Sequence, residues 1–303
     1  MLQSEVGGSV SNGDFDSPVS ALKIKKIILP VDFPNTSLGL LHQAAALAHH
    51  FHSEVVMLHV MTELSHETGA HDNGLQISGS HRETIIRAQK NLDRYLGREF
   101  RGLAIHRMLV NGNPVQAFVQ AAQAEKADLI MMSSHGLTFS QFLLHPGTAK
   151  VNDCPIWTNP QVEESPAQEF VIRNILCAVD FDPPSHTTVS WAAQMAAEFG
   201  ARLTLAHVTA SLKRWGPGGS YVDPEWKKLL VSAASQHLEK LRQDWGIEAD
   251  IFIGNGDMPN VLGQAAKQTK ADLLVNECYP YCGNLGLHGF SIISSLPIPV
   301  LSV

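Results

Sequence analysis

The sequence has few of the features that mark several large classes of protein. Its 303 residues include only four cysteines, too few for a fold held by disulfides, and this favours a reducing, cytoplasmic setting. Acidic residues outnumber basic ones by 29 to 22, so the chain lacks the basic excess of a nucleic-acid-binding protein. No apolar run approaches the about 18 residues of a membrane span, so we expect no membrane partner.

The N-terminal residues 1–21 also lack the features of a targeting segment. They have no basic start and no apolar stretch, so they are not expected to be a signal peptide and are interpreted as a disordered tail. The chain as a whole has an ordinary globular balance, with 44% hydrophobic and 17% charged residues. A length of 303 residues predicts two domains rather than one.

An internal repeat divides the chain. Residues 25–60 match residues 173–208 at a shift of 148, and residues 111–131 match residues 255–275 at a shift of 144. The matched pairs include Asp32 with Asp180, His59 with His207, Gly112 with Gly256 and Asp128 with Asp272. This period is far above the roughly 20–50 residues of a solenoid repeat, so each copy is a whole domain.

Strand and helix patterns alternate within each copy. In the first copy, we expect strands at Ile24–Val31, Glu54–Met61, His106–Val110, Asp128–Met132 and Pro155–Trp157. We expect helices at residues 38–51, capped by Ser37, at His81–Phe100 and at Val115–Glu125, with a short turn after Gly147. The second copy repeats this order. The alternation predicts an α/β protein with two open parallel sheets in tandem, each flanked by helices.

The composition sets the expected boundaries of the two domains. The segment 159–170 is rich in proline and glutamate and is interpreted as a linker. The predicted order is the tail at 1–21, a first domain at 22–158, the linker, and a second domain at 171–303.

The α/β pattern indicates where a ligand would bind. Open parallel sheets bind ligands beyond the carboxyl ends of their strands. In the first copy these positions are Pro30, Val31, Asp32, Val60 and Met132 to Gly136. Asp32, like Asp180, could accept hydrogen bonds from a ribose or a loop N–H, or it could cap the following helix.

These residues carry a resemblance to a known family. PVDF and AVDF end the first strand of each copy, LHV and AHV lie in the second strand, a G-x-P precedes the third helix, and DLIMMSSHG includes the fourth strand. In this order, twice, the motifs resemble the universal stress protein family over nearly the whole chain outside the tail and linker. The resemblance implies Rossmann-like five-stranded parallel sheets that pair through their last strands. Here that pairing could lie within one chain, and a homodimer also stays open.

The resemblance also implies a test for nucleotide binding. Members that bind ATP carry G-x2-G-x9-G-[ST] after the fourth strand, where backbone N–H groups approach phosphates. The first copy has Ser133-x2-Gly136-x10-Gly147-Thr148, with Pro146 at the family position of the third glycine. The expected phosphate ligands are Ser133, His135, Gly136, Gly147 and Thr148. Asp32 would hold the ribose or base edge, and Val31 and Val60 would line the adenine slot.

The second copy departs further from that motif. Glu277 and Pro280 occupy its first two glycine positions, and Gly289 is followed by Phe290. A carboxylate repels a triphosphate and proline has no N–H to donate, so we expect no ATP there. A different small ligand stays open for this copy.

The other candidate motifs favour structural interpretations. Cys278, Cys282 and His288 form an incomplete zinc set, so no metal is predicted, although a metal or redox role for them stays open. His49, His50 and His52 lie at the C-terminal end of the first helix, where they complement the helix dipole. Other positions with structural interpretations are His59 and His207, as hydrogen-bonded strand residues, Cys154 and Cys177, as packing residues, and Gly254, as part of a loop. No nucleophile, base and oxyanion hole come together, so no catalytic residue is predicted.

The sequence therefore predicts a cytoplasmic, non-enzymatic stress-response or signalling module. It would bind ATP, a related nucleotide, another small molecule or a protein partner, with the nucleotide held by the first copy. Two alternatives stay open. The protein could be a slow nucleotide hydrolase, or a ligand-free interaction scaffold in which His145, Pro146 and Glu277 close the two clefts.

Overall fold

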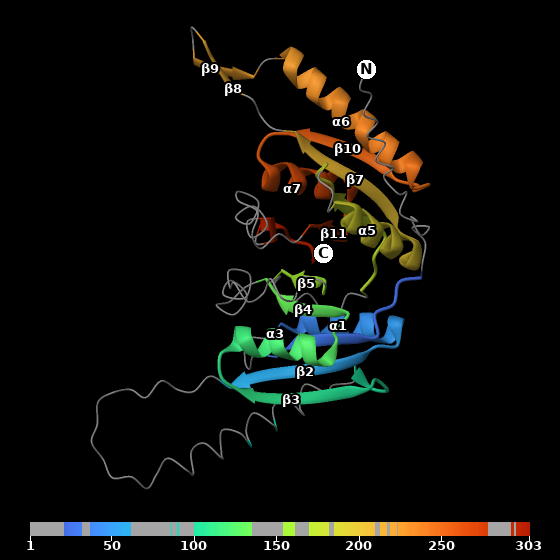
Figure 1. Cartoon of the computed structure of the whole chain (residues 1–303), viewed down its shortest axis with the longest axis vertical. Coiled ribbons are helices and arrows are strands. Elements are labelled where there is room, and N and C mark those ends of the chain that lie inside the picture. Colours follow the sequence, from blue (N-terminus) through green and yellow to red (C-terminus); the bar gives the residue numbers. More distant parts are fainter. Residues whose placement is uncertain are drawn as a thin grey trace, which may run out of the picture.

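Strands and helices alternate along the chain in a computed structural model (Figure 1). It describes residues 21–31, 37–61, 86, 90, 100–134, 154–160, 170–181, 185–209, 213–216, 219–222, 224–277, 292–293 and 295–303. The first unit contains β1 (Lys26–Pro30), α1 (Leu38–Phe51), β2 (Glu54–Met61), β3 (Ile105–Asn111), α3 (Pro114–Glu125), β4 (Leu129–Ser133) and β5 (Ile156–Asn159). The second unit contains β6 (Asn174–Ala178), α5 (Ser185–Phe199), β7 (Arg202–Thr209), α6 (Pro224–Asp244), β10 (Asp250–Asn255), α7 (Met258–Thr269), β11 (Leu273–Asn276) and β12 (Val300–Ser302). A hairpin of β8 (Lys213–Gly216) and β9 (Gly219–Val222) follows β7.

The strands of both units form one continuous ten-stranded sheet. Its order is β10-β7-β6-β11-β12-β5-β4-β1-β2-β3, so each unit contributes five neighbouring strands. Neighbours within each unit pair in parallel, and β12 pairs with β5 antiparallel. The α/β fold predicted from the sequence is therefore confirmed, and the two sheets join through their last strands within one chain.

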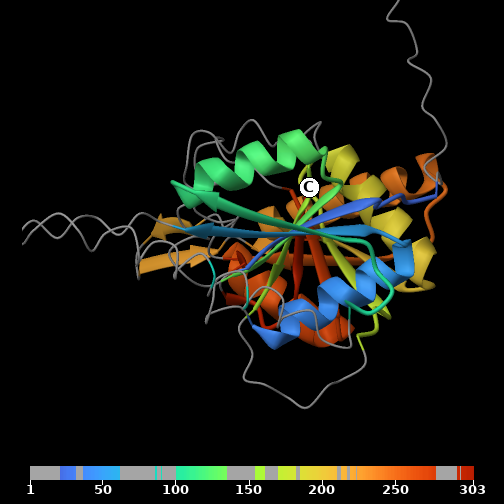
Figure 2. The same cartoon turned by 90° about the horizontal axis from the view of Figure 1, so that it is seen from below.

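Helices cover both faces of this sheet and enclose two hydrophobic cores. Viewed along the sheet, α1 and α3 lie on opposite sides of it (Figure 2). One core packs α1, α5 and α6 against one face, and the other packs α3 and α7 against the opposite face. Because most strands are covered on both faces, their sequences are nearly continuous apolar runs rather than alternating ones.

The element boundaries follow the sequence signals closely. The strand Glu54–Met61 and the cap of α1 are as expected, since Ser37 Oγ accepts a hydrogen bond from the Leu40 N–H at 3.1 Å. β5 continues to Asn159, so the first residue of the expected linker belongs to a strand. The helix expected at His81–Phe100 lies mostly outside the described residues, although Ile86 and Lys90 are helical.

The β8–β9 hairpin was not expected from the repeat, because the first copy offers no matching strand pattern. A turn signal was present, since Pro217–Gly218 is a dipeptide typical of turns. Two four-residue strands are too short for a clear alternating pattern, so only the turn could have indicated them.

The repeated aspartates anchor the start of each unit. One carboxylate oxygen of Asp128 accepts hydrogen bonds from the backbone N–H groups of Lys25 and Lys26, at 2.8 and 2.9 Å. Asp272 does the same for Arg173 and Asn174, at the same two distances. Both contacts tie the loop before β4 or β11 to the beginning of the neighbouring central strand. The match between the two copies at this position therefore has a structural cause.

Candidate functional site

The candidate site is the carboxyl edge of the first unit. The strand order reverses between β1 and β4, because the chain leaves β1 towards β2 and β3 on one side and returns to β4 and β5 on the other. Ligands of open α/β sheets bind at such a reversal. The described candidate residues Pro30, Val31, Val60, Met132 and Ser133 all belong to the ends of β1, β2 and β4 or follow them directly.

The β1–β2 side of this edge is apolar. Pro30 is half-buried at the end of β1, and Val31 follows it with 2% exposure. The Val31 N–H donates to the Leu58 carbonyl at 2.8 Å, which continues the pairing one residue beyond the strand. Val60 is half-buried near the end of β2. Val31 packs into the core on the α1 side of the sheet and Val60 against the core on the α3 side, so of these three residues Pro30 and Val60 leave apolar surface at this edge.

The β4–β5 side is polar. Met132 is buried, and Ser133 ends β4 in a half-buried position. The next residue, Ser134, is buried and donates its N–H to the Asn159 carbonyl at 2.9 Å. The change from valines to serines across one edge of the sheet suits a ligand with one apolar and one polar end.

The N-terminus of α1 lies close to the same edge. A Cβ at Gly39, in the first turn of α1, would lie 3.3 Å from Asn159 Nδ2. That is a tight approach, so the glycine allows the helix to begin close to the end of β5. A helix N-terminus favours negative charge, and here Ser37 already caps one of its N–H groups, that of Leu40.

Several predicted site residues cannot be compared with the structure. Asp32, His135, Gly136, Gly147 and Thr148 lie outside the described residues, as does Pro146. The same holds for Pro280, Gly289 and Phe290 of the second copy and for Cys278, Cys282 and His288.

The second unit differs at the equivalent edge. Glu277 stands half-buried where the first unit has Ser133, directly after β11. Its neighbour Asn276 is buried, and Asn276 Oδ1 accepts a hydrogen bond from Ser302 Oγ at 2.9 Å. A carboxylate at this position makes the edge of the second unit unfavourable for phosphate groups.

The histidines that repeat between the copies have the same contact in both units. Nδ1 of His59 lies 2.7 Å from the Val31 carbonyl, and Nδ1 of His207 lies 2.8 Å from the Val179 carbonyl. Because a carbonyl can only accept, Nδ1 carries the proton in each ring. Both side chains are half-buried and hold the residue after β1 or β6 against the neighbouring strand. This is the hydrogen-bonded structural role expected from the sequence.

Sequence reasoning missed a ring cluster beside the second unit's edge. The ring of Phe181, 41% exposed, lies 4.2 Å from that of His207 and 4.8 Å from that of His237 on α6, measured between centroids. In the sequence Phe181 is singled out only as the last residue of the AVDF motif, and His237 lies in the helix whose first-copy counterpart, His81–Phe100, is mostly outside the described residues. No periodicity places these rings together, because the contact depends on how α6 crosses the sheet.

The described cysteines are suited to packing rather than to chemistry. Burial, together with the nearby charge of Asp128, raises the pKa of the Cys154 thiol to about 12. Burial likewise raises the pKa of the fully buried Cys177. Both are free cysteines, and among the described residues no three His, Cys, Asp or Glu side chains lie close enough to hold a metal ion.

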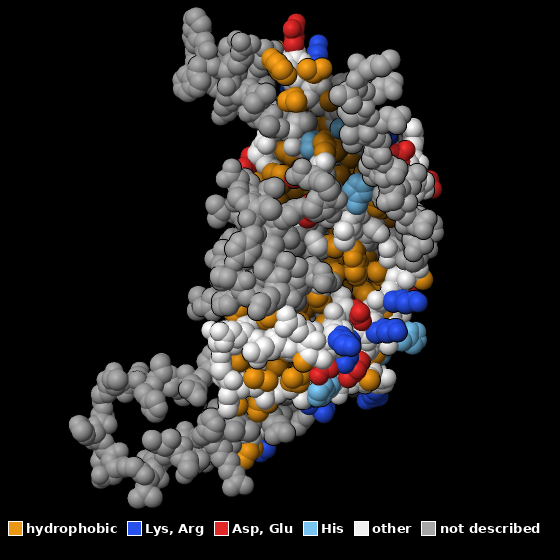
Figure 3. All heavy atoms as spheres, viewed as in Figure 1, with side chains coloured by type: hydrophobic (Ala, Val, Ile, Leu, Met, Phe, Trp, Pro, Cys, Tyr) orange, Lys and Arg blue, Asp and Glu red, His pale blue; other side chains and the backbone are white. Residues whose placement is uncertain are grey.

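A charged cluster of the first unit lies away from the candidate site, at the amino end of the strands. Lys26 Nζ, at the start of β1, lies 2.6 Å from a carboxylate oxygen of Glu125 and 3.5 Å from one of Glu54. The hydrogen bond from Lys26 lowers the pKa of Glu125 and in return raises that of Lys26. On the face drawn in Figure 3, basic and acidic side chains over the first unit lie side by side.

Comparison with known proteins gives one consistent result. The model of the Universal stress protein family matches residues 23–152 and 172–277. A universal stress protein of Methanocaldococcus jannaschii is 30% identical over 138 residues, which cover 44% of this chain and 79% of that protein.

Solved structures resemble the chain over both units. A universal stress protein from Archaeoglobus fulgidus has a TM-score of 0.66 at 17% identity, with 92% of this chain and 96% of that chain covered. A putative universal stress protein from Pseudomonas aeruginosa has a TM-score of 0.57 at 15% identity, with 92% and 93% covered. At these identities the likeness concerns the fold. Among the described helices, none combines the length and the apolar character that crossing a membrane would require.

Proposed function

Because the chain belongs to the universal stress protein family, we propose that it is a non-enzymatic stress-response module that binds ATP or a related nucleotide in its first unit. The family match covers both copies of the repeat. The proposed domains are residues 22–158 and 171–303, in a cytoplasmic protein whose units pair within the chain. A homodimer of whole chains and an unidentified protein partner are compatible with this arrangement.

One observation carries the proposal: Ser133, the last residue of β4, and Glu277, which directly follows β11, occupy equivalent positions in the two units. A phosphate group near Ser133 meets a hydroxyl that donates a hydrogen bond. The same group near Glu277 would meet a carboxylate, and two negative charges about 4 Å apart repel by roughly 4 kcal/mol near a protein surface. We therefore predict that the first unit binds a nucleotide and that the second unit does not.

The apolar half of the edge supports the base-binding part. Pro30 and Val60 are half-buried at the ends of the neighbouring strands β1 and β2, and they leave apolar surface for an adenine ring. In this proposal Val31 completes the adenine slot, with its side chain buried in the core on the α1 side of the sheet. In this proposal Asp32 holds the ribose or base edge, and His135, Gly136, Gly147 and Thr148 complete the phosphate contacts with Met132 and Ser133.

The experiment is calorimetric titration of the full chain with ATP, with the second unit as an internal comparison. We expect one ATP per chain, and a loss of affinity of at least about 30-fold in Ser133→Glu, because the variant copies the second unit's carboxylate. Glu277→Ser is the matched control, and it should leave the first site's affinity unchanged. Absence of binding to the unaltered chain at millimolar ATP would overturn the proposal and favour a ligand-free scaffold.

A long incubation with ATP separates binding from slow hydrolysis. We expect intact ATP to be recovered, because the described residues of the edge offer no arrangement of nucleophile and base. ADP that accumulates with the unaltered chain, but not with Ser133→Glu, would show that the protein is a slow nucleotide hydrolase instead.

A further inference from the structure

The two units meet about a local two-fold axis. β5 and β12 pair antiparallel, with Trp157 opposite Leu301, and the pairs on either side are Thr158 with Val300 and Ile156 with Ser302. At the shift of 144 that relates β5 to β12, Trp157 and Leu301 are equivalent residues. A residue that faces its own equivalent lies on the axis, as in the isologous interface of a symmetric dimer.

The same axis passes through the helix layer. His50 and Glu198 are equivalent at the shift of 148, and His50 Nε2 lies 2.8 Å from Glu198 Oε1. The next residues, Phe51 and Phe199, are also equivalent, and their ring centroids are 6.0 Å apart. The C-terminal ends of α1 and α5 therefore meet each other on the same face of the sheet as Trp157.

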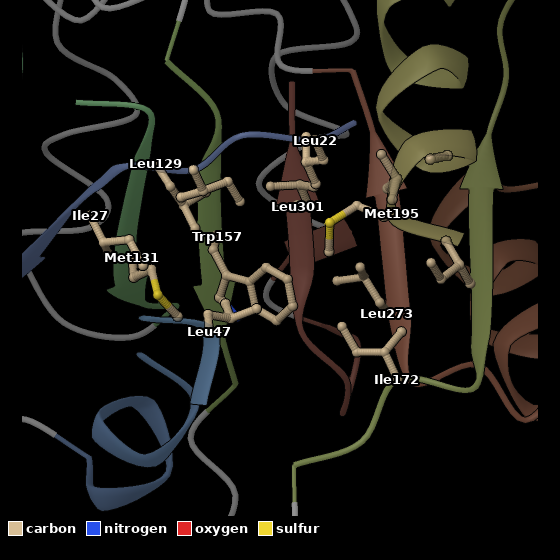
Figure 4. Packing of buried hydrophobic residues seen from close by; sticks show 14 of the residues in the cluster. Leu22, Ile27, Leu47, Leu129, Met131, Trp157, Ile172, Met195, Leu273 and Leu301 are labelled. Atoms are coloured by element: carbon tan, nitrogen blue, oxygen red, sulfur yellow. The ribbon is translucent and has the colours of Figure 1, made fainter. Parts of the chain in front are cut away.

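At two of these three axial contacts the equivalent residues differ, and at both they complement each other. Trp157 is among the largest fully buried side chains, and it packs opposite the smaller Leu301 in the same layer (Figure 4). Directly opposite residues of an antiparallel pair lie on the same face, with Cβ atoms about 5 Å apart. Pairing two first units would bring two indoles to the axis, and pairing two second units would bring two leucines and leave space unfilled.

The surroundings of Trp157 are specific to the first unit. Its indole N–H donates to Gln43 Oε1 at 2.9 Å, and Gln43 Nε2 donates to Asn159 Oδ1 at 2.9 Å. The residue equivalent to Gln43 in α5 is Trp191, which packs against the edge of the same core. The first unit thus has its indole on the strand and a glutamine on the helix, while the second unit has its indole on the helix.

The contact of His50 with Glu198 is likewise complementary only between unlike units. His50 donates its Nε2–H to a carboxylate, and its ring also stacks on Phe199 with centroids 4.5 Å apart. Two second units in this geometry would place two Glu198 carboxylates against each other, which is a repulsive contact. Two first units would place two histidines there, with no carboxylate to accept from either.

We propose that the surface between the units is built to accept only the unlike unit. Trp157 with Leu301 and His50 with Glu198 favour the first unit against the second, and they disfavour either unit against its own kind. The surface that would otherwise recruit a second copy of the chain is thereby occupied from within the chain. This inference concerns assembly and does not depend on the proposed nucleotide.

The test uses the full chain with a protease site inserted between residues 161 and 169 and cleaved after folding. Unlabelled and ¹⁵N-labelled cleaved proteins are mixed in increasing urea, and the pairs are identified by native mass spectrometry. Pairs of mixed label show that exchange has taken place. Once half of the pairs carry mixed label, we expect pairs of first with second unit and almost no like pairs. Like and unlike pairs in statistical proportions would overturn the proposal.

Charge-exchange variants test the axis itself. His50→Glu places two carboxylates at the contact and should raise the dissociation constant of the cleaved pair by about tenfold. The double variant His50→Glu with Glu198→His should return it to within about twofold of the original, because the two positions are equivalent about the axis. An unchanged constant in His50→Glu, or a double variant as weak as the single one, would show that this contact does not select the pairing.

Discussion

The two units of this chain share the contacts that anchor their strands, but they differ at the carboxyl edge and at the surface between the units. Asp128 and Asp272 anchor the central strands in the same way, and His59 and His207 make the same hydrogen bond. The differences lie at the carboxyl edge, where Ser133 is matched by Glu277, and at the axis between the units. The two copies therefore share the contacts that anchor each unit, and they differ at the surfaces where we propose that a nucleotide and the other unit bind.

A second difference lies inside the units. The loop expected at Gly254 was wrong, because Gly254 lies in β10. A Cβ there would overlap Cγ1 of Val261 on α7, so no side chain fits. The first unit has Val110 and Ala117 at the equivalent positions. Large and small residues have thus changed places between strand and helix, which keeps the packed volume similar.

The largest expected loss of stability comes from removing the indole at the axis between the units. We expect Trp157→Ala to lower the free energy of unfolding by about 3–5 kcal/mol, because it leaves a cavity and removes the partner of Gln43. Chemical denaturation followed by circular dichroism measures it. Trp226→Ala, at an exposed position on α6, is the control and should cost at most about 0.5 kcal/mol. Equal costs for the two variants would contradict the role assigned to Trp157.

The next effect tests the exchange of large and small residues. Gly254→Ala should lower the free energy of unfolding by about 2 kcal/mol, because the new methyl group overlaps Val261. Adding Val261→Ala, which copies the first unit's Ala117, should recover part of that loss. Gly263→Ala is the control, since its new Cβ would meet only Leu296, at an ordinary 3.7 Å. The interpretation would fail if thermal denaturation showed the same loss for both glycines.

A smaller effect should be the same in both units. Asp128→Asn and Asp272→Asn each weaken two hydrogen bonds from backbone N–H groups to a charged oxygen, and we expect each to cost about 1 kcal/mol. Parallel denaturation curves measure the two costs. A large cost in one unit and none in the other would show that the shared anchor does not act equally.

The smallest expected change in stability comes from the contact between Lys26 and Glu125, which the first unit alone has. The Lys26 contact lowers the pKa of Glu125, so it stabilises the fold above the unfolded pKa of glutamate, near 4.3, and this contribution is lost as pH falls through the lower, folded value. The raised pKa of Lys26 sets the upper limit, because the contribution is lost again as pH rises above about 10.4.

Glu125→Gln should therefore cost at most about 1 kcal/mol at pH 7, since the side chains are partly exposed, and less at pH 3, where Glu125 becomes protonated. Denaturation at the two pH values measures it, with the exposed Glu248→Gln as control. The second unit has Asn174 and Thr269 at the equivalent positions and should show no such dependence. A cost that stayed the same at pH 3 would rule out the charge of Glu125 as its cause.

The sequence by itself determined the fold class and most element boundaries. Buried parallel strands need continuous apolar runs and helices need caps, so Glu54–Met61 and the Ser37 cap could be read directly. The repeat then supplied the second unit and identified the positions at the ends of the strands. These signals depend only on residues that are close together in the chain, so they can be recognised without knowing how the elements pack.

Only the tertiary structure decided which side chains from distant parts of the sequence contact each other. The contact of Phe181 with His237, the network of Gln43 with Trp157, and the meeting of His50 with Glu198 join residues from 56 to 148 positions apart. No period in the sequence fixes such contacts, because they depend on the angles at which helices cross the sheet and on the register of β5 against β12. The sequence provides the equivalence of His50 and Glu198, and the antiparallel pairing of the last strands brings these equivalent residues together on one axis.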